Sequence, residues 1–248
     1  MIPHHELNSQ EVNSLGQPIG NIVPNWQPVA FPVREEMRGR FCRLEPLDVD
    51  RHAEDLYQAN SLDKEGRSWT YLPYGPFDGF TEYKNWLTQS ALGSDPLYFA
   101  ILSEATGKAV GVSSYLRIDP NHGCIEVGHL NFSPLLQATP AATEAMYLMM
   151  ERAFDLGYRR YEWKCHSLNA PSRRAAQRFG FSFEGIFRQA VVIKGRNRDT
   201  AWYSIIDQEW PALRFVFQQW LAPTNFDEQG TQRTSLASLT AALAKQQE

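Results

Sequence analysis

The sequence has few cysteines and no long apolar run. Cys42, Cys124 and Cys165 are widely spaced and odd in number and form no CxxC pair, which argues against a zinc site and a disulfide framework. Every apolar run is too short to span a bilayer, and the first residues lack the basic start and apolar core of a signal peptide. These absences exclude a membrane-embedded or disulfide-stabilised protein, and we expect a cytoplasmic protein without a bound metal.

The chain also lacks an excess of positive charge. It has 24 Lys and Arg against 28 Asp and Glu, for a net charge of -4 at pH 7. A basic excess is what nucleic acids and anionic membranes attract, so we expect neither as a partner. What the chain does have is 248 residues that are 43% hydrophobic and 12% aromatic, enough for a sizeable core.

Three regions differ in composition. Residues 1–37 are rich in Pro, Asn and Gln and predict an extended arm that lies over the rest of the chain. Residues 38–221 alternate between periodic apolar segments and short turns, as expected of one domain. Residues 222–248 form a polar tail, in which 233–245 is either a weak Ala-rich helix or disordered.

The order of the predicted elements indicates an α/β fold with one mixed sheet. Short turns join apolar segments at 97–103, 109–118 and 124–132, which predicts an antiparallel meander. A helical segment then leads to a strand at 160–166, and this short return predicts a parallel βαβ unit. The other elements are a strand at 41–47, helices that end near 60, 92 and 221, and a hairpin of 181–194 with 200–206. We predict a single domain whose sheet is flanked by helices.

The stretch from Glu126 to Asp155 passes from a strand through a polar turn into a strongly periodic helix. Thr139 is the expected N-cap, because its hydroxyl accepts from an N–H two or three residues on, and Pro140 suits the first helical position. The first N–H groups of a helix have no partner within it and lie at its positive end, which favours a phosphate. The alternative is a capped helix that packs on the sheet and binds nothing.

Two other stretches carry candidate features. The aromatic loop at 61–80 either packs on the core or forms the wall of a pocket. Around Gly195, we expect Arg196 and Arg198 to decorate a hairpin turn rather than bind substrate.

Three segments, QATPAATEA, NAPSRRAAQRFGF and FEGIFRQAVVIKGRNRDTAWYSI, follow one another in that order. With this order and spacing, residues 38–210 resemble the GNAT superfamily of acetyl-CoA-dependent N-acetyltransferases. The closer likeness is to the branch that includes the N-terminal acetyltransferase of the ribosomal protein L7/L12. The resemblance implies acetyl-CoA as co-substrate and a primary amine as acceptor.

The resemblance also assigns a cofactor site. The pyrophosphate loop maps to residues 137–142, where Pro140 replaces the first glycine and removes one N–H donor. The main chain near Asn131 and Phe132 would pair with the pantetheine arm, and Asn169 would contact that arm. The residues assigned to acetyl-CoA are Asn131, Phe132, Gln137, Ala138, Thr139, Ala141, Ala142, Thr143, Asn169 and Ser172.

The reaction asks for a base and an acid. Amines near pH 7 are mostly protonated, with pKa values of roughly 7.7–8.0 for an α-amine and 10.4 for lysine, so a nearby carboxylate is needed to take a proton. The resemblance places this base at Glu184, and Ser172 would protonate the departing thiolate. Glu126 is the second candidate base, and His129 either assists by hydrogen bonding or is packed in the fold.

Glu184 and Ser172 each also have a purely structural interpretation. Glu184 would otherwise form a surface ion pair with Arg188 or Arg178, and Ser172 would only start a helix. We predict direct attack of a primary amine on acetyl-CoA in a ternary complex. A non-catalytic CoA-binding sensor or scaffold, and a transferase for a longer acyl-CoA, are the rival functions. The acceptor can be a small-molecule amine or a protein N-terminus. A homodimer is also possible.

Overall fold

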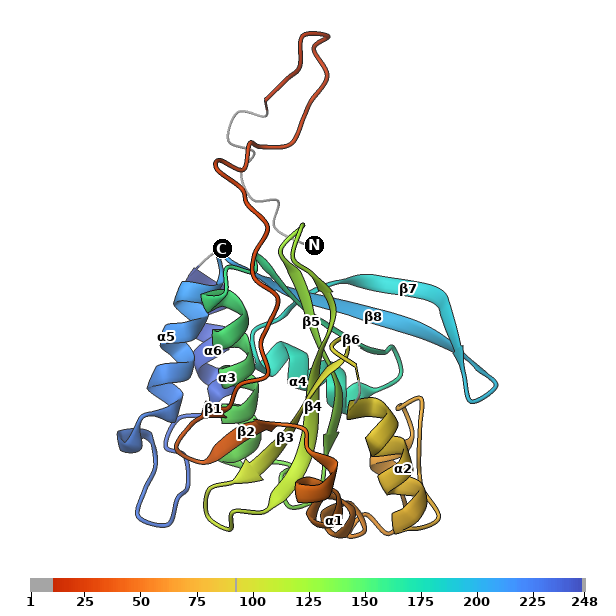
Figure 1. Cartoon of the computed structure of the whole chain (residues 1–248). Helices are drawn as coiled ribbons and strands as arrows, with labels where there is room; N and C mark the ends of the chain where they lie inside the picture. The colour runs from red at the N-terminus through yellow and green to blue at the C-terminus, as the bar shows by residue number, and fades with distance from the viewer. Residues whose placement is uncertain (1–10, 92, 247–248) are drawn as a thin grey trace.

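The computed structural model describes residues 11–91 and 93–246, which are arranged around one mixed sheet (Figure 1). The strands are β1 (Met37–Arg38), β2 (Cys42–Pro46), β3 (Leu97–Ser103), β4 (Ala109–Asp119), β5 (Cys124–Phe132), β6 (Arg160–His166), β7 (Ser182–Ile193) and β8 (Arg196–Ile206). The α-helices are α1 (Val49–Asn60), α2 (Phe80–Ala91), α3 (Pro140–Asp155), α4 (Ala170–Arg178), α5 (Trp210–Leu221) and α6 (Leu236–Gln246). Two short 3-10 helices are η1 (Arg67–Trp69) and η2 (Pro223–Asn225).

The order of strands across the sheet is β1-β2-β3-β4-β5-β6-β8-β7. Neighbours from β1 to β5 are antiparallel, β5 and β6 are parallel, and β6, β8 and β7 are again antiparallel. The predicted meander, βαβ unit and mixed α/β sheet are therefore confirmed.

Helices cover both faces of the sheet. This explains why apolar and polar residues do not alternate along the sequence of β3. Leu97, Phe99 and Ile101 belong to the core that contains α3 and α5. Tyr98 and Ala100, between them, belong to a second core with α1 and α2. Because side chains alternate along a strand, a strand covered on both faces reads as one apolar run.

Helix α3 begins as its sequence predicts. Thr139 is the N-cap, and its Oγ1 accepts from the main-chain N–H of Ala142 at 3.2 Å. Pro140 occupies the first turn, where a missing N–H costs least. The helix is buried along most of its length because the sheet and α5 pack against it. Its N-terminus is thereby fixed relative to β5.

A buried carboxylate ties the N-terminal strands to this helix. Glu144 in α3 is 4% exposed and accepts from the N–H groups of Arg40, Phe41 and Cys42 at 2.8, 2.5 and 2.9 Å. Gly39 precedes these donors, and a Cβ there would collide with the Glu144 carboxylate. We name Glu144 and residues 39–42 the N-terminal clasp.

The hairpin at the edge of the sheet differs from the prediction. Its turn is only Lys194 and Gly195, with φ of 50° and 71°, instead of residues 195–199. Two residues with positive φ match the twist of the flanking strands, so a two-residue turn suffices. Asn197 pairs with Val192, so the expectation that Arg196 and Arg198 lie in the turn was wrong: both belong to β8.

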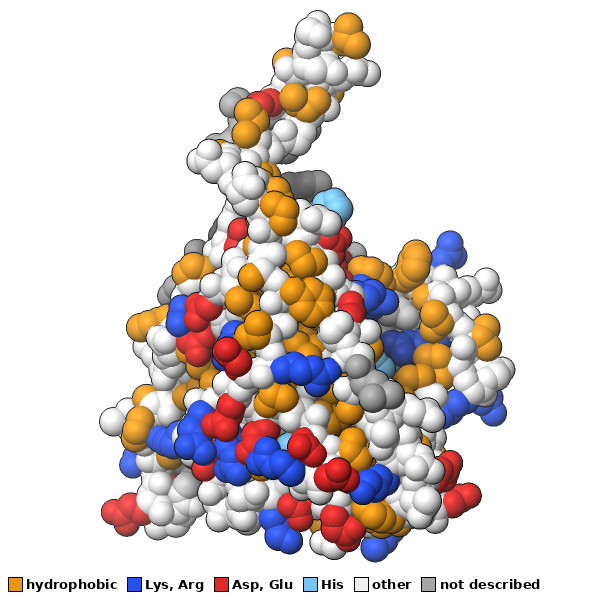
Figure 2. All heavy atoms as spheres, in the orientation of Figure 1, with side chains coloured by type: hydrophobic (Ala, Val, Ile, Leu, Met, Phe, Trp, Pro, Cys, Tyr) orange, Lys and Arg blue, Asp and Glu red, His pale blue; other side chains and the backbone are white. Residues whose placement is uncertain are grey.

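The described part of the arm both contacts and leaves the body of the protein. Trp26 Nε1 donates to the Asn121 carbonyl at 2.9 Å, and the Val29 N–H donates to that of Pro120 at 3.1 Å. The chain before these contacts projects away from the body and carries exposed apolar side chains such as Leu15 (Figures 1 and 2). Residues 1–10 of the predicted arm lie outside the described residues.

The C-terminal segment contains a helix, which was one of the two alternatives predicted for residues 233–245. Helix α6 packs against α5, and Leu236 joins the main core. Before it, Phe226 contacts Phe41 edge to face, with ring centroids 5.3 Å apart. The domain boundaries at 37 and 221 stay a prediction.

Candidate active site

The site lies where β5 and β6 separate. The two strands pair from Cys124 opposite Arg160 to Val127 opposite Trp163. Beyond Val127, β6 continues with β8, whereas the facing edge of β5 has no strand partner among the described residues. A cavity of about 460 Å³ opens at this separation. It is lined by β5 and β6, the start of α4, the β7–β8 hairpin and part of the aromatic loop.

Glu126 lines this cavity and is 4% exposed. Arg117 Nε donates to it at 2.7 Å, and Lys164 Nζ lies 3.2 Å from the same carboxylate. Burial raises the pKa of Glu126, although both cations act in the opposite direction. The cavity thus contains a carboxyl group whose pKa lies above the usual value for Glu.

Glu184 is placed differently, and it is not among the residues that line the cavity. Arg160 binds its two oxygens at 2.7 and 2.6 Å, and Ser204 Oγ donates to it at 2.7 Å. Hydrogen bonding from Arg160 lowers the pKa of Glu184. The ion-pair alternative is therefore present, with Arg160 in place of Arg188 or Arg178. The catalytic role of Glu184 stays a prediction.

Ser172 and Asn169 reach the cavity together from the start of α4. Asn169 is the N-cap, and its Oδ1 accepts from the Ser172 N–H at 3.1 Å. Trp163 Nε1 donates to Ser172 Oγ at 3.0 Å. This bond uses the oxygen as an acceptor, which leaves the hydroxyl hydrogen of Ser172 for another partner.

Cys165 also lines the cavity. Burial raises the pKa of its thiol, while hydrogen bonding from Ser172 acts in the opposite direction. A thiol with a raised pKa is mostly protonated at neutral pH and is a poor nucleophile. The chemistry of the cavity therefore does not centre on this sulfur.

Eight of the ten predicted cofactor residues lie where β5 turns into α3, and the other two, Asn169 and Ser172, lie at the start of α4. Asn131 and Phe132 end β5, and Gln137 Nε2 donates to the Phe132 carbonyl at 2.7 Å. The N–H groups of Leu136 and Gln137 both donate to the Ser133 carbonyl, at 2.9 and 3.0 Å. These bonds fold the turn so that it runs directly from the end of β5 into the helix.

The turn uses some of the predicted main-chain donors itself. The Thr139 N–H donates to the Leu136 carbonyl at 3.3 Å, and the Ala142 N–H is taken by the cap. Of the predicted donors, Ala138, with φ of 59°, Ala141 and Thr143 hold N–H groups that neither the turn nor the cap employs among the described residues. Thr143 Oγ1 also accepts from Arg178 Nη2 at 2.8 Å.

The aromatic loop forms one wall of the cavity, as one of its two interpretations predicts. Tyr71, Leu72 and Pro73 line it, whereas Trp69 is buried in the second core. Sequence reasoning missed how this wall is held. Lys194 at the hairpin turn donates through Nζ to the carbonyls of Trp69, Tyr74 and Gly75 at 3.0, 3.3 and 2.7 Å.

His129 is packed rather than free. Its Nδ1 lies 3.2 Å from the Tyr74 hydroxyl, and the two rings stack with centroids 5.7 Å apart. Burial lowers the pKa of His129 to about 4. The imidazole is therefore neutral at physiological pH and can only give or accept a hydrogen bond there.

Residues 11–91 and 93–246 carry neither a metal cluster nor a membrane-spanning helix. That part of the chain holds no cluster of three or more His, Cys, Asp or Glu side chains placed to bind a metal. None of its helices combines the length and apolar character that crossing a membrane requires.

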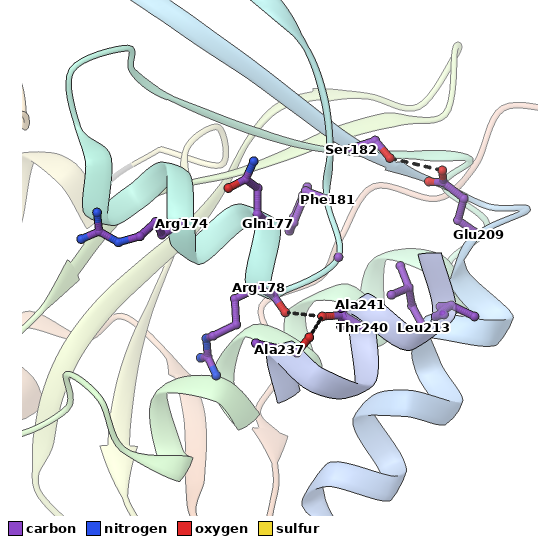
Figure 3. Close-up of a pocket in the computed structure, with 12 residues that line it drawn as sticks. Arg174, Gln177, Arg178, Phe181, Ser182, Glu209, Leu213, Ala237, Thr240 and Ala241 are labelled. Atoms are coloured by element: carbon purple, nitrogen blue, oxygen red, sulfur yellow. Dashed lines mark hydrogen bonds between the residues drawn. The ribbon is translucent and has the colours of Figure 1, made fainter. Parts of the chain in front are cut away.

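A second cavity of about 440 Å³ lies between α4, α5, α6 and the start of β7 (Figure 3). We name it the helix cavity, and the one between β5 and β6 the central cavity.

Known proteins share this architecture. The family model described as acetyltransferase (GNAT) domain matches residues 42–182. The crystal structure of a GCN5-related N-acetyltransferase from Brucella melitensis is 49% identical, with a TM-score of 0.85, over 88% of this chain and 99% of that chain. A probable acetyltransferase of the GNAT family from Chromobacterium violaceum is 41% identical, with a TM-score of 0.74, over 79% of this chain and 98% of that chain.

These matches show that the chain is an acyltransferase. The chain belongs to the acetyltransferase (GNAT) family, as predicted. A curated relative, the uncharacterized N-acetyltransferase p20 of Bacillus licheniformis, is 26% identical over 113 residues, and the match spans 45% of this chain and 63% of that protein. The Salmonella typhimurium enzyme that modifies the N-terminal serine of L7/L12 shares the fold at 21% identity, with a TM-score of 0.59.

Proposed function

We propose that this protein transfers an acetyl group from acetyl-CoA to a primary amine by direct attack in a ternary complex. Family membership supports acyl transfer in general. The observation that carries the specific proposal is the central cavity, because it brings Glu126 and Ser172 together beside an open strand edge. A base, an acid and a place for an extended ligand are what this reaction needs.

The residues that would bind acetyl-CoA fit its chemistry. The unused N–H groups of Ala138 and Ala141 lie at the positive end of α3, which suits a pyrophosphate. The edge of β5 beyond Val127 offers main-chain groups to a pantetheine arm, as a sheet edge does to an added strand. Bound there, acetyl-CoA supplies an acetyl group already activated as a thioester.

We assign the proton acceptor to Glu126, the second of the two predicted bases. It lies in the cavity, and its raised pKa brings it nearer to that of an amine, which favours proton transfer near neutral pH. Glu184 has both oxygens engaged by Arg160 and a lowered pKa, which makes it the weaker base. Glu126 would take the proton directly or through a water molecule.

Ser172 is proposed as the proton donor to the departing thiolate. Trp163 donates to its oxygen at 3.0 Å, and its hydroxyl hydrogen, which is directed to the Cys165 thiol in this structure, would turn to the sulfur anion of the departing thiolate. The protonated state of Cys165 supports direct attack over a covalent relay.

A screen of amine acceptors monitored by thiol release tests the proposal. We expect thiol release that depends on both acetyl-CoA and an amine, for a small-molecule amine or a peptide N-terminus. Binding of acetyl-CoA without turnover of any amine would instead favour a CoA-binding sensor or scaffold. Faster turnover of a longer acyl-CoA would show that this molecule, and not acetyl-CoA, is the acyl donor. A cytoplasmic setting and a homodimer stay predictions.

A further inference from the structure

Arg198 is a cation in the central cavity without a counter-ion. It reaches the cavity from β8, and its Nε is buried without a hydrogen-bond partner. Among the described residues, no carboxylate lies within ion-pair distance of its guanidinium. Burial is the main cause that lowers the pKa of Arg198, yet a guanidinium stays charged at any physiological pH. Arg198 as a whole is half-buried, and a charge that is partly removed from water and has no partner is costly, so its place in the cavity suits a ligand that supplies one.

The rest of the lining does not neutralise it. The cavity contains the cations Arg117, Lys164 and Arg198 against the single carboxylate of Glu126. Both Arg117 and Lys164 already pair with Glu126. Lys164 also pairs with Glu162 at 2.6 Å and lies 3.4 Å from the ring centroid of Trp202. Arg198 is therefore the cation of this lining that the described residues leave unsatisfied.

The phosphates of acetyl-CoA are not its natural partner in the proposed arrangement. They are assigned to the turn before α3, and no residue of that turn lines the central cavity. The thioester end and the acetyl group, which would enter the cavity, carry no charge. Of the two substrates, the acceptor is therefore the one that can bring a negative charge to Arg198.

We propose that Arg198 binds an anionic group of the acceptor, a carboxylate or a phosphate monoester, so that the substrate is an amine with a negative charge of its own. This inference deepens the proposed function and rests on it. The planar guanidinium presents donors in a fork that matches two oxygens of either anion. The amine would then face Glu126 while the anion faces Arg198.

Two substrate pairs separate the sources of the anion. L-phenylalanine is compared with L-phenylalaninamide, and O-phosphoethanolamine with ethanolamine, as acceptors for the full chain and acetyl-CoA. We expect Arg198→Gln to raise KM for the anionic member of one pair about 10- to 100-fold, the usual size of a charged hydrogen bond. KM for its neutral member and for acetyl-CoA should stay within about twofold. Arg198→Lys should recover part of the loss.

Arg196→Gln is the matched control. Arg196 lies on the same strand, is exposed and does not line the cavity, so its substitution removes the same charge without touching the site. Comparing each variant with the wild type cancels the difference in amine pKa between the members of a pair. An equal loss for both members of each pair, or an equal effect of Arg196→Gln, overturns the inference.

A binding measurement makes the result independent of turnover. N-acetyl-L-phenylalanine and its carboxamide differ only in the anion, as do N-acetyl-O-phosphoethanolamine and N-acetylethanolamine, and calorimetry measures their affinity directly. Tighter binding of an anionic member, lost in Arg198→Gln, supports the inference even if no amine is acetylated, and the proposed function alone then fails. Equal affinity within both pairs overturns the inference whatever the activity.

Discussion

The two cavities are nearly equal in volume but differ in how their polar groups are used. In the helix cavity of about 440 Å³, Thr240 Oγ1 lies 3.4, 3.1 and 3.2 Å from the carbonyl oxygens of Arg178, Leu236 and Ala237, and Ser182 Oγ contacts Glu209 at 3.5 Å (Figure 3). These groups bind one another, and two other polar side chains that line this cavity, Arg174 and Gln177, are exposed to solvent. In the central cavity of about 460 Å³, Arg198 is left without a partner. Volume therefore does not identify a site here, whereas unused polar groups do.

Replacement of Glu126 should give the largest effect and tests the central cavity directly. Glu126→Gln keeps the shape but removes the base, so kcat should fall about 10²- to 10⁴-fold. Glu184→Gln is the matched control, since that carboxylate lies outside the cavity lining, and it should cost less than about tenfold. Steady-state kinetics on both variants decides between them: a larger loss in Glu184→Gln returns the base to the position first predicted from the resemblance.

The pH dependence of kcat should follow the raised pKa of Glu126. A base must be ionised, so kcat falls as the pH drops through this pKa, at a higher pH than for an ordinary Glu of about 4.3. This fall of kcat at low pH, the acid limb of the profile, should be absent from the residual activity of Glu126→Gln. His129, with a pKa of about 4, would titrate below that range. A profile that keeps its acid limb in the variant would contradict the assignment.

The turn before α3 should respond to charge. Ala138 is exposed and holds an unused N–H, so Ala138→Glu brings a negative charge to the proposed phosphate position with little risk to folding. We expect acetyl-CoA to bind about tenfold more weakly or worse. Ala138→Gln has the same size without the charge and should bind much as the wild type. Equal affinities of the two variants by calorimetry would reject the loop assignment.

The N-terminal clasp should matter for stability and not for chemistry. Glu144→Ala removes the acceptor of three N–H groups, of which that of Cys42 is buried, and this should lower the free energy of unfolding by about 3 kcal/mol. Glu54→Ala, on the exposed face of α1, should change it by less than about 0.5 kcal/mol. Denaturant titration measures both. A stable Glu144→Ala protein would show that the clasp contributes little.

The smallest effect is expected in the helix cavity. Ala241 lines it from an exposed position on α6, so Ala241→Leu fills space without disturbing the sheet. Acetyl transfer should stay within about twofold of the wild type, because no group there is proposed to act in the reaction. A tenfold loss of kcat/KM in the same thiol-release assay would break the distinction between the two cavities.

Local chemistry made much of the fold predictable. Thr139 and Pro140 predict the start of α3 because a cap and a missing N–H act within four residues. Asn169 predicts the start of α4 for the same reason, which also places Ser172. These residues reach the central cavity, or the turn next to it, through local structure alone.

The missed features depend on contacts between distant segments. Glu184 lies at a register shift between Phe183 and Gly185, and an extra residue in a strand changes which side later side chains face. Lys194 meets the aromatic loop more than a hundred positions earlier. Neither arrangement has a local signal in the sequence, and Arg198 was misplaced because the turn before it is shorter than its polar residues suggest.

The N-terminal clasp also sets when one contact can form during synthesis of the chain. Its donors at Arg40 and Cys42 precede Glu144 by 104 and 102 residues. At about 5–20 residues per second, a ribosome needs roughly 5–20 s to extend the chain from one to the other. During that interval the three N–H groups cannot bind Glu144, so the link between residues 39–42 and α3 forms only after α3 has been made.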